Sequence, residues 1–335
     1  MSRDPLPDRI TRLADGFMTS RVLLSAVDLG LFTELAKHSM DEERLRKRLK
    51  LNRRGARDFF DALTSLGLLR HRNGIYSNTK ETGFYLDKSR PTYIGGLLEM
   101  DSGHLYSSWA SLTKALRTGN PIGLKRRKEL FDTRYKDPEG LRSFLNAMTG
   151  ISMAPARIMA KKFPWSDYES FFDIGTARGG VPVQIALVHK HLTGGGFDLP
   201  LIKPIFEEYV RSFGLENRVR FVSGDFFKDP FPKADVLIMG HILHDWNWKK
   251  KKFLIKKAFS SLRKNGAFIA YESILDDKRM SNTAGLIASL NMLVETQGGF
   301  EYTFEECFKW MREAGFRRTY SEHLIGPKSM VVAIK

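Results

Sequence analysis

Residues 171–180, with the sequence FFDIGTARGG, join an apolar run to a glycine-containing loop. The apolar start is typical of a buried strand, and Gly175 and Gly179 interrupt it before a helical pattern begins. A carboxylate, Asp198, closes the next apolar stretch. Glycines let the backbone approach a ligand closely, and an acidic residue after the second strand can bind ribose hydroxyls. The segment therefore predicts a nucleotide-type cofactor site in an α/β domain.

Apolar runs alternate with helical segments through the rest of the C-terminal half. This alternation predicts a mostly parallel, doubly wound sheet. The later strands are expected at 219–222, 234–239, 266–274 and 329–334. In such sheets ligands bind beyond the carboxyl ends of the strands. Four polar side chains are expected on that rim: Asp198, Asp225, His244 and Glu272.

The order of these motifs resembles that of the S-adenosylmethionine-dependent O-methyltransferases of the caffeic acid and acetylserotonin type, with the bacterial small-molecule enzymes as the nearest branch. The resemblance runs from about Leu13 to the C-terminus. It is carried by the glycine loop and by the later segments FDLP (197–200), GDFF (224–227), LHDW (243–246) and GGFEYT (298–303). It implies a winged-helix dimerisation domain over 1–95 and a Rossmann-like catalytic domain over 96–335, with a helical linker over 96–165.

The resemblance implies that His244 is the general base, flanked by the carboxylates of Glu272 and Glu301. A neutral imidazole, with an ordinary pKa near 6.5, can take a proton from a phenol as its oxygen attacks a methyl carbon. We expect Glu272 to orient or charge-stabilise the ring and Glu301 to approach from the other side. His241 and His104 are the next candidates for the base.

The cofactor implied is S-adenosylmethionine. Asp198 would bind the ribose hydroxyls, and Asp225 with Phe226 would hold the adenine. Gly240 stands where plant members carry a lysine four residues before the base. The implied cofactor-binding residues are Ser152, Gly175, Gly179, Asp198, Asp225, Phe226 and Gly240.

A helix within the mostly helical stretch Pro91–Lys161 carries Phe144, Met148 and Ser152 at i, i+4 and i+8, so they share one face. Ordinary core packing explains most such stripes. The resemblance implies instead that this face lines the active site. The implied substrate-binding residues are Met100, His104, Phe144, Met148 and Met292. The polar piece Thr118–Lys128 is expected to be an exposed loop.

Two departures from the family pattern affect the cofactor site. Thr176, Ala177 and Arg178 stand in a loop that is usually richer in glycine. Arg178 would then meet the cofactor carboxylate or point to solvent. The acidic pair usual after the tryptophan is replaced by Asn247-Trp248 and a run of lysines.

The N-terminal part and the charge raise the alternative of DNA binding. Met40–Leu51 predicts one helix, Asn52 caps a second that Gly67 ends, and Asn73-Gly74 indicates a hairpin. This order predicts a winged helix, a fold that often binds DNA. The formal net charge is +16, from 54 Lys and Arg against 38 Asp and Glu.

We expect a homodimer rather than a nucleic-acid complex. The segment Val22–Phe32 is too apolar for one amphipathic stripe, so it is expected to pack on more than one side. Lys and Arg are spread along the chain and are not confined to the would-be recognition helix, although that helix carries Arg53, Arg54 and Arg57. The charge then reflects a solvated basic surface.

Composition is consistent with an enzyme in the reducing cytoplasm. No apolar run approaches the roughly 20 residues that cross a bilayer, and no secretory leader is expected at the N-terminus. Cys307 is the only cysteine, which excludes an intrachain disulfide. It follows Thr303 and Glu306, a capping-box pattern, and is expected in the core. No metal is expected.

The predicted activity is methyl transfer to a hydroxyl, most simply phenolic, of a small aromatic or polyketide-like molecule. Two alternatives stay open: the same scaffold performing hydroxylation, decarboxylation or ring closure, and a winged-helix DNA-binding regulator. The sequence leaves open which acceptor is used and whether O, N or C is methylated.

Overall fold

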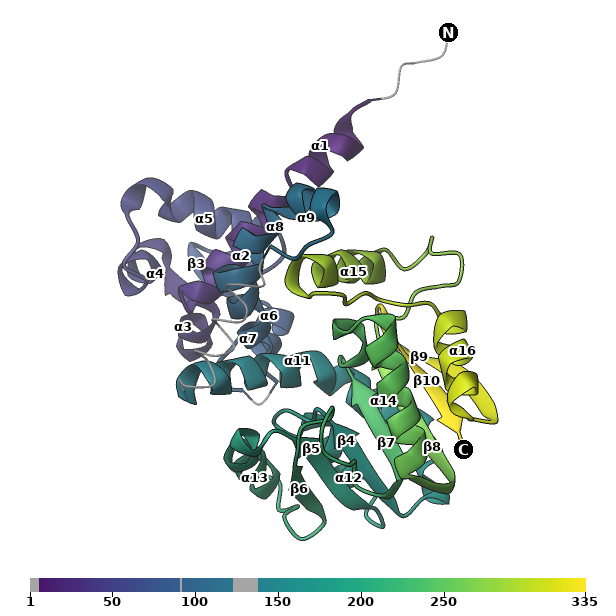
Figure 1. Cartoon of the computed structure of the whole chain (residues 1–335). Coiled ribbons are helices and arrows are strands. Elements are labelled where there is room, and N and C mark those ends of the chain that lie inside the picture. The colour runs from purple at the N-terminus through teal and green to yellow at the C-terminus, as the bar shows by residue number, and fades with distance from the viewer. Residues whose placement is uncertain (1–5, 91, 123–137) are drawn as a thin grey trace. The chain divides into compact units, whose positions relative to one another are not determined.

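The computed structural model describes residues 6–90, 92–122 and 138–335. These residues belong to two compact units, Met1–Ser107 and Ser108–Lys335 (Figure 1). The predicted domain boundary lay after residue 95. The N-terminal unit continues to Ser107 because the helix Gly95–Met100 and the π-helical turn Asp101–Leu105 pack on the helix Gly16–Asp28.

The N-terminal unit surrounds a three-stranded sheet of order β1-β3-β2 with helices. Its elements are α1 (Asp8–Ala14), α2 (Gly16–Asp28), α3 (Leu31–Lys37), β1 (Met40–Asp41), α4 (Glu42–Arg48), α5 (Arg53–Ser65), β2 (Leu69–Arg72), β3 (Ile75–Asn78), α6 (Lys80–Tyr85), α7 (Gly95–Met100) and η1 (Asp101–Leu105), with α8 (Tyr106–Trp109) at the boundary.

The prediction of one helix over Met40–Leu51 is wrong. Residues 40 and 41 form β1, which pairs antiparallel with β3, and α4 begins only at Glu42. The physical reason is a cap: the carboxylate of Asp41 accepts the backbone N–H of Arg44 at 2.9 Å, and a capping residue has extended backbone.

The rest of the predicted winged helix is confirmed. Asn52 caps α5, because its side-chain oxygen accepts the N–H of Arg54 at 2.9 Å. Asn73 and Gly74, with φ of 50° and 75°, form the tight turn between β2 and β3. These angles are those of the hairpin turn that Asn-Gly favours.

One side of the apolar segment Val22–Phe32 is buried in the N-terminal unit, and the expected packing of a second side stays a prediction. Ala26 and Val27 are buried in the core of the N-terminal unit. Other residues of α2 face away from that core and line an open hollow of about 530 Å³. The hollow is lined by Phe17, Met18, Arg21, Val22, Ser25, Leu29, Leu51, Asn52, Gly55, Ala56, Phe59 and Tyr106.

The second unit is built on a seven-stranded sheet of order β6-β5-β4-β7-β8-β10-β9. The strands from β6 to β8 pair in parallel, and β10 pairs antiparallel with both of its neighbours, β8 and β9. This confirms the predicted mostly parallel, doubly wound sheet. The strands are β4 (Ser170–Ile174), β5 (Thr193–Asp198), β6 (Val219–Ser223), β7 (Ala234–Gly240), β8 (Leu262–Glu272), β9 (Arg318–Ile325) and β10 (Lys328–Ile334).

Helices cover both faces of this sheet (Figure 1). The buried residues of α14 and α16 pack on one face, and those of α11 and α12 on the other. The helices are α9 (Leu112–Thr118), α11 (Pro138–Lys162), η2 (Trp165–Asp167), α12 (Gly180–Val188), η3 (Pro200–Ile202), α13 (Lys203–Arg211), η4 (Leu243–Asp245), α14 (Trp248–Ser261), α15 (Thr283–Glu295) and α16 (Phe304–Ala314).

Three local predictions fall in this unit. Thr303 and Glu306 form the expected capping box of α16, and Cys307 is fully buried in the core. The expected loop Thr118–Lys128 begins at the end of α9, and its part from residue 123 onward lies outside the described residues.

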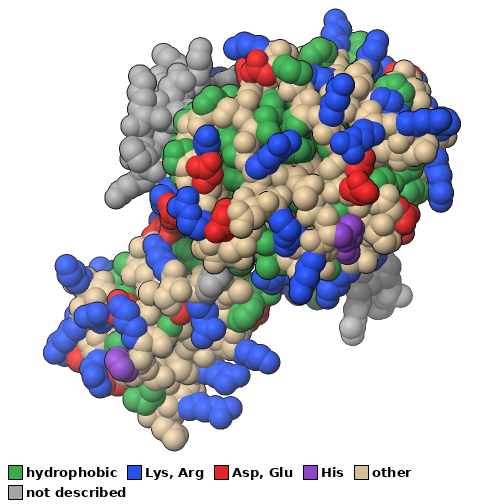
Figure 2. All heavy atoms as spheres, turned by 90° about the horizontal axis from the view of Figure 1, so that it is seen from below, with side chains coloured by type: hydrophobic (Ala, Val, Ile, Leu, Met, Phe, Trp, Pro, Cys, Tyr) green, Lys and Arg blue, Asp and Glu red, His purple; other side chains and the backbone are tan. Residues whose placement is uncertain are grey.

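Figure 2 shows how charged side chains are distributed over one face of the molecule. In the face drawn in Figure 2, Lys and Arg side chains are scattered among acidic, apolar and neutral ones. Within the described part of the chain, no helix has the length and apolar character needed to span a bilayer.

Candidate active site

Polar side chains follow the carboxyl ends of neighbouring parallel strands, as predicted. Asp198 is the last residue of β5 and Glu272 the last of β8. Asp225 follows β6, and His244 lies in η4 after β7. The rim has two parts, which we name after the predicted roles of their residues: a base side around β7 and β8, and a cofactor side around β4, β5 and β6.

On the base side, His244 makes a short hydrogen bond to a buried carboxylate. Its Nδ1 lies 2.8 Å from Oε1 of Glu301, whose side chain is fully buried. The His244 side chain is 12 % exposed, so the ring is nearly enclosed but reachable. With Nδ1 engaged by Glu301, the lone pair of a neutral ring is on Nε2.

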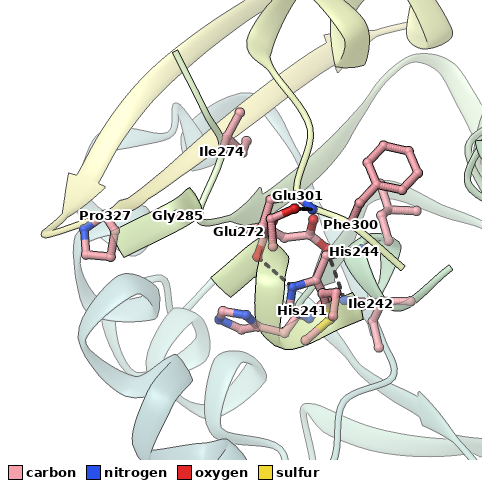
Figure 3. Close-up of polar contacts among 12 residues, drawn as sticks. His241, Ile242, His244, Glu272, Ile274, Gly285, Phe300, Glu301 and Pro327 are labelled. Carbon is pink, nitrogen blue, oxygen red and sulfur yellow. Dashed lines mark hydrogen bonds and ion pairs between the residues drawn. The ribbon is translucent and has the colours of Figure 1, made fainter. Parts of the chain in front are cut away.

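Glu272 contacts the backbone around His244 rather than its imidazole ring. Oε1 of Glu272 accepts the backbone N–H groups of Ile242 and His244, each at 3.1 Å (Figure 3). The two carboxylates thus contact different parts of the same residue: Glu301 bonds the imidazole of His244, and Glu272 bonds the backbone of the turn that carries it. From the sequence, Glu272 was expected to orient or charge-stabilise the ring.

The surrounding charges control the protonation of His244. Burial disfavours the imidazolium, but the negative charges of Glu301 and Glu272 outweigh burial and raise the pKa of His244 to about 9. Burial also raises the pKa of Glu272. The Tyr302 hydroxyl lies beside Glu272, and its pKa is raised by burial and by that carboxylate.

His241, the predicted second choice for the base, has a different environment. Burial and the neighbouring charge of Lys328 lower its pKa well below the ordinary value. Its Nδ1 lies 3.4 Å from Nζ of Lys328. His241 is therefore a neutral imidazole with one nitrogen already facing an ammonium group, whereas His244 faces a carboxylate.

A buried lysine at the base side was not recognised from the sequence. Lys251 on α14 is fully buried, and its Nζ donates hydrogen bonds to three backbone carbonyls. The sequence analysis grouped it with the surface lysines 249–252. Its helical spacing with Leu254, Ile255 and Ala258, all buried, was the signal that it lies on the inner face.

The same three residues offer ligand atoms for a metal ion. One atom each of His244, Glu272 and Glu301 lies within 4.8 Å of the others. Nδ1 of His244 is hydrogen-bonded to Glu301.

On the cofactor side, Asp198 is held by backbone donors. Its Oδ2 accepts the N–H of Ala177 and its Oδ1 the N–H of Leu199, both at 2.8 Å. A carboxylate has about four lone-pair directions, so capacity remains for ligand hydroxyls. Burial raises the pKa of Asp198 to about 6, against the lowering effect of these two N–H groups.

The glycine loop needs its glycines. Gly175 and Gly179 have φ of 75° and 91°. A Cβ at Gly175 would lie 2.4 Å from the Ile242 side chain, and a Cβ at Gly179 would lie 2.7 Å from the Phe206 ring. Ala177 adopts φ of 50°, a left-handed angle that costs an alanine energy. Gly240 is also required by space, because a Cβ there would lie 1.9 Å from the Tyr271 ring. A lysine, as in the plant members, does not fit beside this tyrosine.

Arg178 contacts protein on both sides. Its guanidinium donates to the side-chain oxygen of Asn146 on α11 and lies 4.3 Å from the ring centre of Tyr209 on α13. From the sequence, Arg178 was expected either to meet the cofactor carboxylate or to point to solvent, and neither expectation included these contacts with Asn146 and Tyr209.

The predicted stripe on α11 lies along the cofactor side. Phe144 packs with Ala177 and Leu199 around a small cluster that includes Leu141 and Ile202. Ser152 hydrogen-bonds the Tyr271 hydroxyl, whose pKa burial raises. Met148, between them on the same face, is partly exposed.

The remaining cofactor candidates border the aromatic cluster near the base. Asp225 accepts the N–H of Phe227 at 2.8 Å, and this bond lowers the pKa of Asp225. Phe226 is partly buried and makes an edge contact with Trp246, 6.0 Å between ring centres. Asp225 and Phe226 are thus fixed next to the turn that follows β6.

Three substrate candidates lie on other elements. Met292 is buried on α15 of the catalytic unit, four residues before Thr296, whose hydroxyl donates to the Met292 carbonyl. Met100 and His104 belong to the N-terminal unit, on α7 and η1. The turn with His104 is π-helical, a distortion that is frequent at functional sites.

Two family models match this chain. The O-methyltransferase dimerisation domain matches residues 11–88, and the O-methyltransferase domain matches residues 109–317. The chain belongs to the O-methyltransferase family. It is an enzyme that transfers methyl groups from S-adenosylmethionine.

Individual relatives match over nearly the whole chain. Tetracenomycin polyketide synthesis 8-O-methyl transferase TcmO of Streptomyces glaucescens is 39% identical over 98% of this chain and 97% of its own. N,N-dimethyltransferase OxyT of Streptomyces rimosus is 34% identical over 97% and 96%. The crystal structure of human N-acetylserotonin methyltransferase in complex with SAM superposes with a TM-score of 0.90, at 28% identity, and covers 100% of this chain and 99% of that one.

Proposed function

We propose that the acceptor is a phenolic hydroxyl of a polyketide-derived aromatic molecule and that His244 removes its proton. The observation that carries this proposal is the 2.8 Å contact between His244 Nδ1 and the buried Glu301, because it leaves Nε2 as the basic atom. The relatives support the acceptor class: TcmO is named for a polyketide, and a 30% identical enzyme of Streptomyces sahachiroi is a naphthoate 3-O-methyltransferase.

The chain's own residues supply alignment and proton transfer. When bound, S-adenosylmethionine supplies a methyl group on a sulfonium that is its own leaving group. Nε2 of His244 takes the hydroxyl proton as the acceptor oxygen attacks, and the Glu301 carboxylate stabilises the imidazolium that forms. Glu272 keeps the turn in place through the Ile242 and His244 N–H groups.

The raised pKa of His244 sets a condition for this mechanism. An imidazole with a pKa of about 9 carries a proton at neutral pH, and a base must first lose it. A positive charge brought into the same buried pocket lowers the pKa of an imidazole. The neutral form of His244 is therefore favoured when the sulfonium cofactor is bound, which couples cofactor loading to activation of the base.

The cofactor residues fit S-adenosylmethionine. Asp198 would bind the ribose hydroxyls with the lone pairs that its two N–H partners leave free. Asp225 and Phe226 would hold and flank the adenine. Gly175, Gly179, Ser152 and Gly240 would border the methionine part. At the three glycines an added Cβ would clash with a neighbouring side chain of the protein.

The acceptor would contact Phe144, Met148 and Met292 of the catalytic unit. For Met100 and His104, which belong to the N-terminal unit, the substrate role stays a prediction from the resemblance. Flexible Met and aromatic side chains suit a flat, apolar ring system.

The test is incubation of the enzyme with methyl-labelled S-adenosylmethionine and a panel of phenols, naphthols and hydroxyanthraquinones, with aminated analogues included. Mass spectrometry identifies the methylated atom. Methylation only of the amines would contradict the O-methyl proposal, and OxyT shows that this family includes an N-methylating relative.

We also propose that the enzyme is a homodimer through its N-terminal unit. Apolar side chains of α1 and α2 are exposed: Ile10 and Leu13 by 73% each, and Phe17 by 59%. Phe17 also lines the apolar hollow along α2. Such a surface is covered in most stable proteins, and a C2 dimer covers it symmetrically. A monomer in sedimentation at micromolar concentration would contradict the proposal.

The regulator alternative gains no specific support. Arg53 and Arg57 on α5 lie within 4 Å of Glu43 and Asp61. Specific duplex binding that resists salt would restore that alternative. The single buried Cys307 is consistent with our expectation of a reducing cytoplasm.

A further inference from the structure

Lys251 is fully buried, although Lys249 and Lys250 directly before it are exposed. Lysine is almost never fully buried unless its ammonium group is paired or hydrogen-bonded, because desolvation of a charge is costly. Burial lowers the pKa of Lys251 to about 8, even with the carboxylates of Glu272 and Glu301 nearby. A residue kept at this cost needs a specific explanation.

The ammonium group has three donors, and each has a partner. Nζ of Lys251 lies 2.9 Å from the carbonyl oxygen of Leu243, 2.7 Å from that of Trp246 and 2.9 Å from that of Phe300. All three acceptors are backbone atoms, so the contacts depend on where the chain runs and not on the identity of those side chains.

These carbonyls flank the reacting machinery. Leu243 precedes His244 directly and Trp246 follows two residues later, while Phe300 directly precedes Glu301. His244 and Glu301 are 57 positions apart in the chain. One ammonium group therefore joins the turn that carries the base to the loop that carries its carboxylate partner.

Other contacts strengthen the same junction. The backbone N–H of Phe300 donates to the carbonyl of His244 at 2.8 Å. The Lys251 ammonium also lies 3.9 Å from the centre of the Phe300 ring, a cation–π contact. The lysine is thus the charged centre of a small bridge between two segments.

We propose that Lys251 is a positioning residue for methyl transfer: it holds the His244 turn and the Glu301 loop at the separation that keeps Nδ1 and Oε1 in hydrogen-bond contact. This inference rests on the proposed roles of His244 and Glu301. An apolar side chain of similar length would remove the shared donor from all three carbonyls, and of these the carbonyl of Leu243 keeps the backbone N–H of Trp246 at 3.1 Å. The side-chain link between the two segments would then be lost.

The test compares Lys251→Met with Lys256→Met, a lysine on the same helix whose side chain is exposed. Methionine keeps most of the length and removes charge and donors. We expect Lys251→Met to lower kcat by about 10- to 100-fold, the size of a small misplacement of catalytic groups. The dissociation constant of S-adenosylmethionine should stay within about threefold, which shows that the catalytic unit is folded. Lys256→Met should keep the parental kcat.

A double variant separates positioning from general loss of structure. If Lys251 acts through the His244–Glu301 contact, Lys251→Met lowers kcat by no more than about threefold when Glu301→Gln is already present, because groups that act as a unit are not additive. If Lys251 only stabilises the fold, the fold losses in kcat of Lys251→Met and Glu301→Gln should multiply in the double variant. If Lys251→Met does not fold, Lys251→Gln is measured by the same criteria, since it keeps two donors without the charge.

Proton NMR gives a readout that does not depend on turnover. In the parent protein the His244 Nδ1 proton, shared with Glu301, should give a far-downfield signal, and Lys251→Met should lose or shift it while Lys256→Met keeps it. An unchanged signal together with kcat within twofold of the parent would overturn the inference. If His244→Ala itself keeps parental turnover, the assignment of the base has failed, and that outcome is distinct from a failure of the lysine inference alone.

Discussion

The base side and the cofactor side of the rim are held in place by different interactions. The base side depends on buried charged groups: His244 pairs with Glu301, and Lys251 joins their two segments. Each of these contacts needs a particular side chain, and each side chain is removed from water.

The cofactor side depends on the backbone. Asp198 is oriented by two N–H groups, and Gly175 and Gly179 occupy left-handed conformations next to bulky side chains. The comparison teaches that the two sides respond differently to mutation. Changes on the base side should alter the rate with little effect on cofactor affinity, and changes on the cofactor side should do the reverse.

The largest expected effect is on the base side. His244→Ala should lower methyl transfer at neutral pH by roughly 10²–10⁴-fold, the usual contribution of a positioned general base. S-adenosylmethionine should bind within about threefold of its parental affinity, because none of the proposed cofactor contacts is removed. Single-turnover kinetics and calorimetry measure the two quantities. If weaker S-adenosylmethionine binding accounted for the whole loss of rate, the proposed difference between the base side and the cofactor side would be contradicted.

The matching change on the cofactor side is Asp198→Ala. It removes charge-assisted hydrogen bonds worth about 1.5–3 kcal/mol, which corresponds to a dissociation constant raised by roughly 10- to 150-fold. Turnover at saturating cofactor should fall much less. The thermal midpoint should also fall, because the N–H groups of Ala177 and Leu199 lose their acceptor. Equal affinity in variant and parent would show that the ribose site lies elsewhere.

A smaller rate effect is expected for Glu301→Gln. The amide keeps the shape but loses the charge that raises the pKa of His244, so that pKa should fall from about 9. Turnover should fall by roughly one order of magnitude, about 1.4 kcal/mol in the barrier. Glu272→Gln should act in the same direction and more weakly.

The same variant has a stability signature. The folded-state pKa of His244 lies above the ordinary value of 6.5, so the ion pair stabilises the fold fully below pH 6.5 and ceases to do so as pH rises through about 9. The gap in unfolding temperature between parent and Glu301→Gln should therefore close over this range. A gap that widens with pH would contradict the assigned charges.

The smallest effect is expected for Ala177→Gly. Ala177 has φ of 50°, and glycine adopts this angle without the steric cost. The variant should be more stable by about 0.5–1 kcal/mol, roughly 1–4 °C in the thermal midpoint, with unchanged turnover. Scanning calorimetry decides this, and a lower midpoint would mean that the methyl group makes contacts that outweigh the strain.

Much of the catalytic unit could be predicted from the sequence, because in parallel sheets the functional side chains lie at the carboxyl ends of the strands. Asp198 and Glu272 end strands, and His244 lies just beyond one, so the parallel topology alone brings them to one rim. The edge strand β9 was not foreseen. Its residues Arg318–Ile325 are mostly polar and exposed, so no apolar run marks them.

The sequence did not predict which side chains contact one another within the site, because this depends on their exact positions in three dimensions. Whether Glu272 or Glu301 contacts the imidazole is decided by a few ångströms of loop geometry. Lys251 was hidden in a run of four lysines, where composition indicates a solvated face and only helical spacing indicates burial. Asp41 likewise decides the start of α4 through one cap that a helical pattern does not reveal.

The central claim is that His244 removes the acceptor proton, and the pH dependence of one ratio tests it most directly. The ratio is the methyl-transfer rate of the parent divided by that of His244→Ala, with an accepted phenol and saturating S-adenosylmethionine. The account predicts a ratio of roughly 10²–10⁴ at neutral pH that falls as pH approaches the acceptor's own pKa, near 10 for a simple phenol, because a phenolate needs no base. A ratio near one at neutral pH, or one that stays constant with pH, would contradict the account.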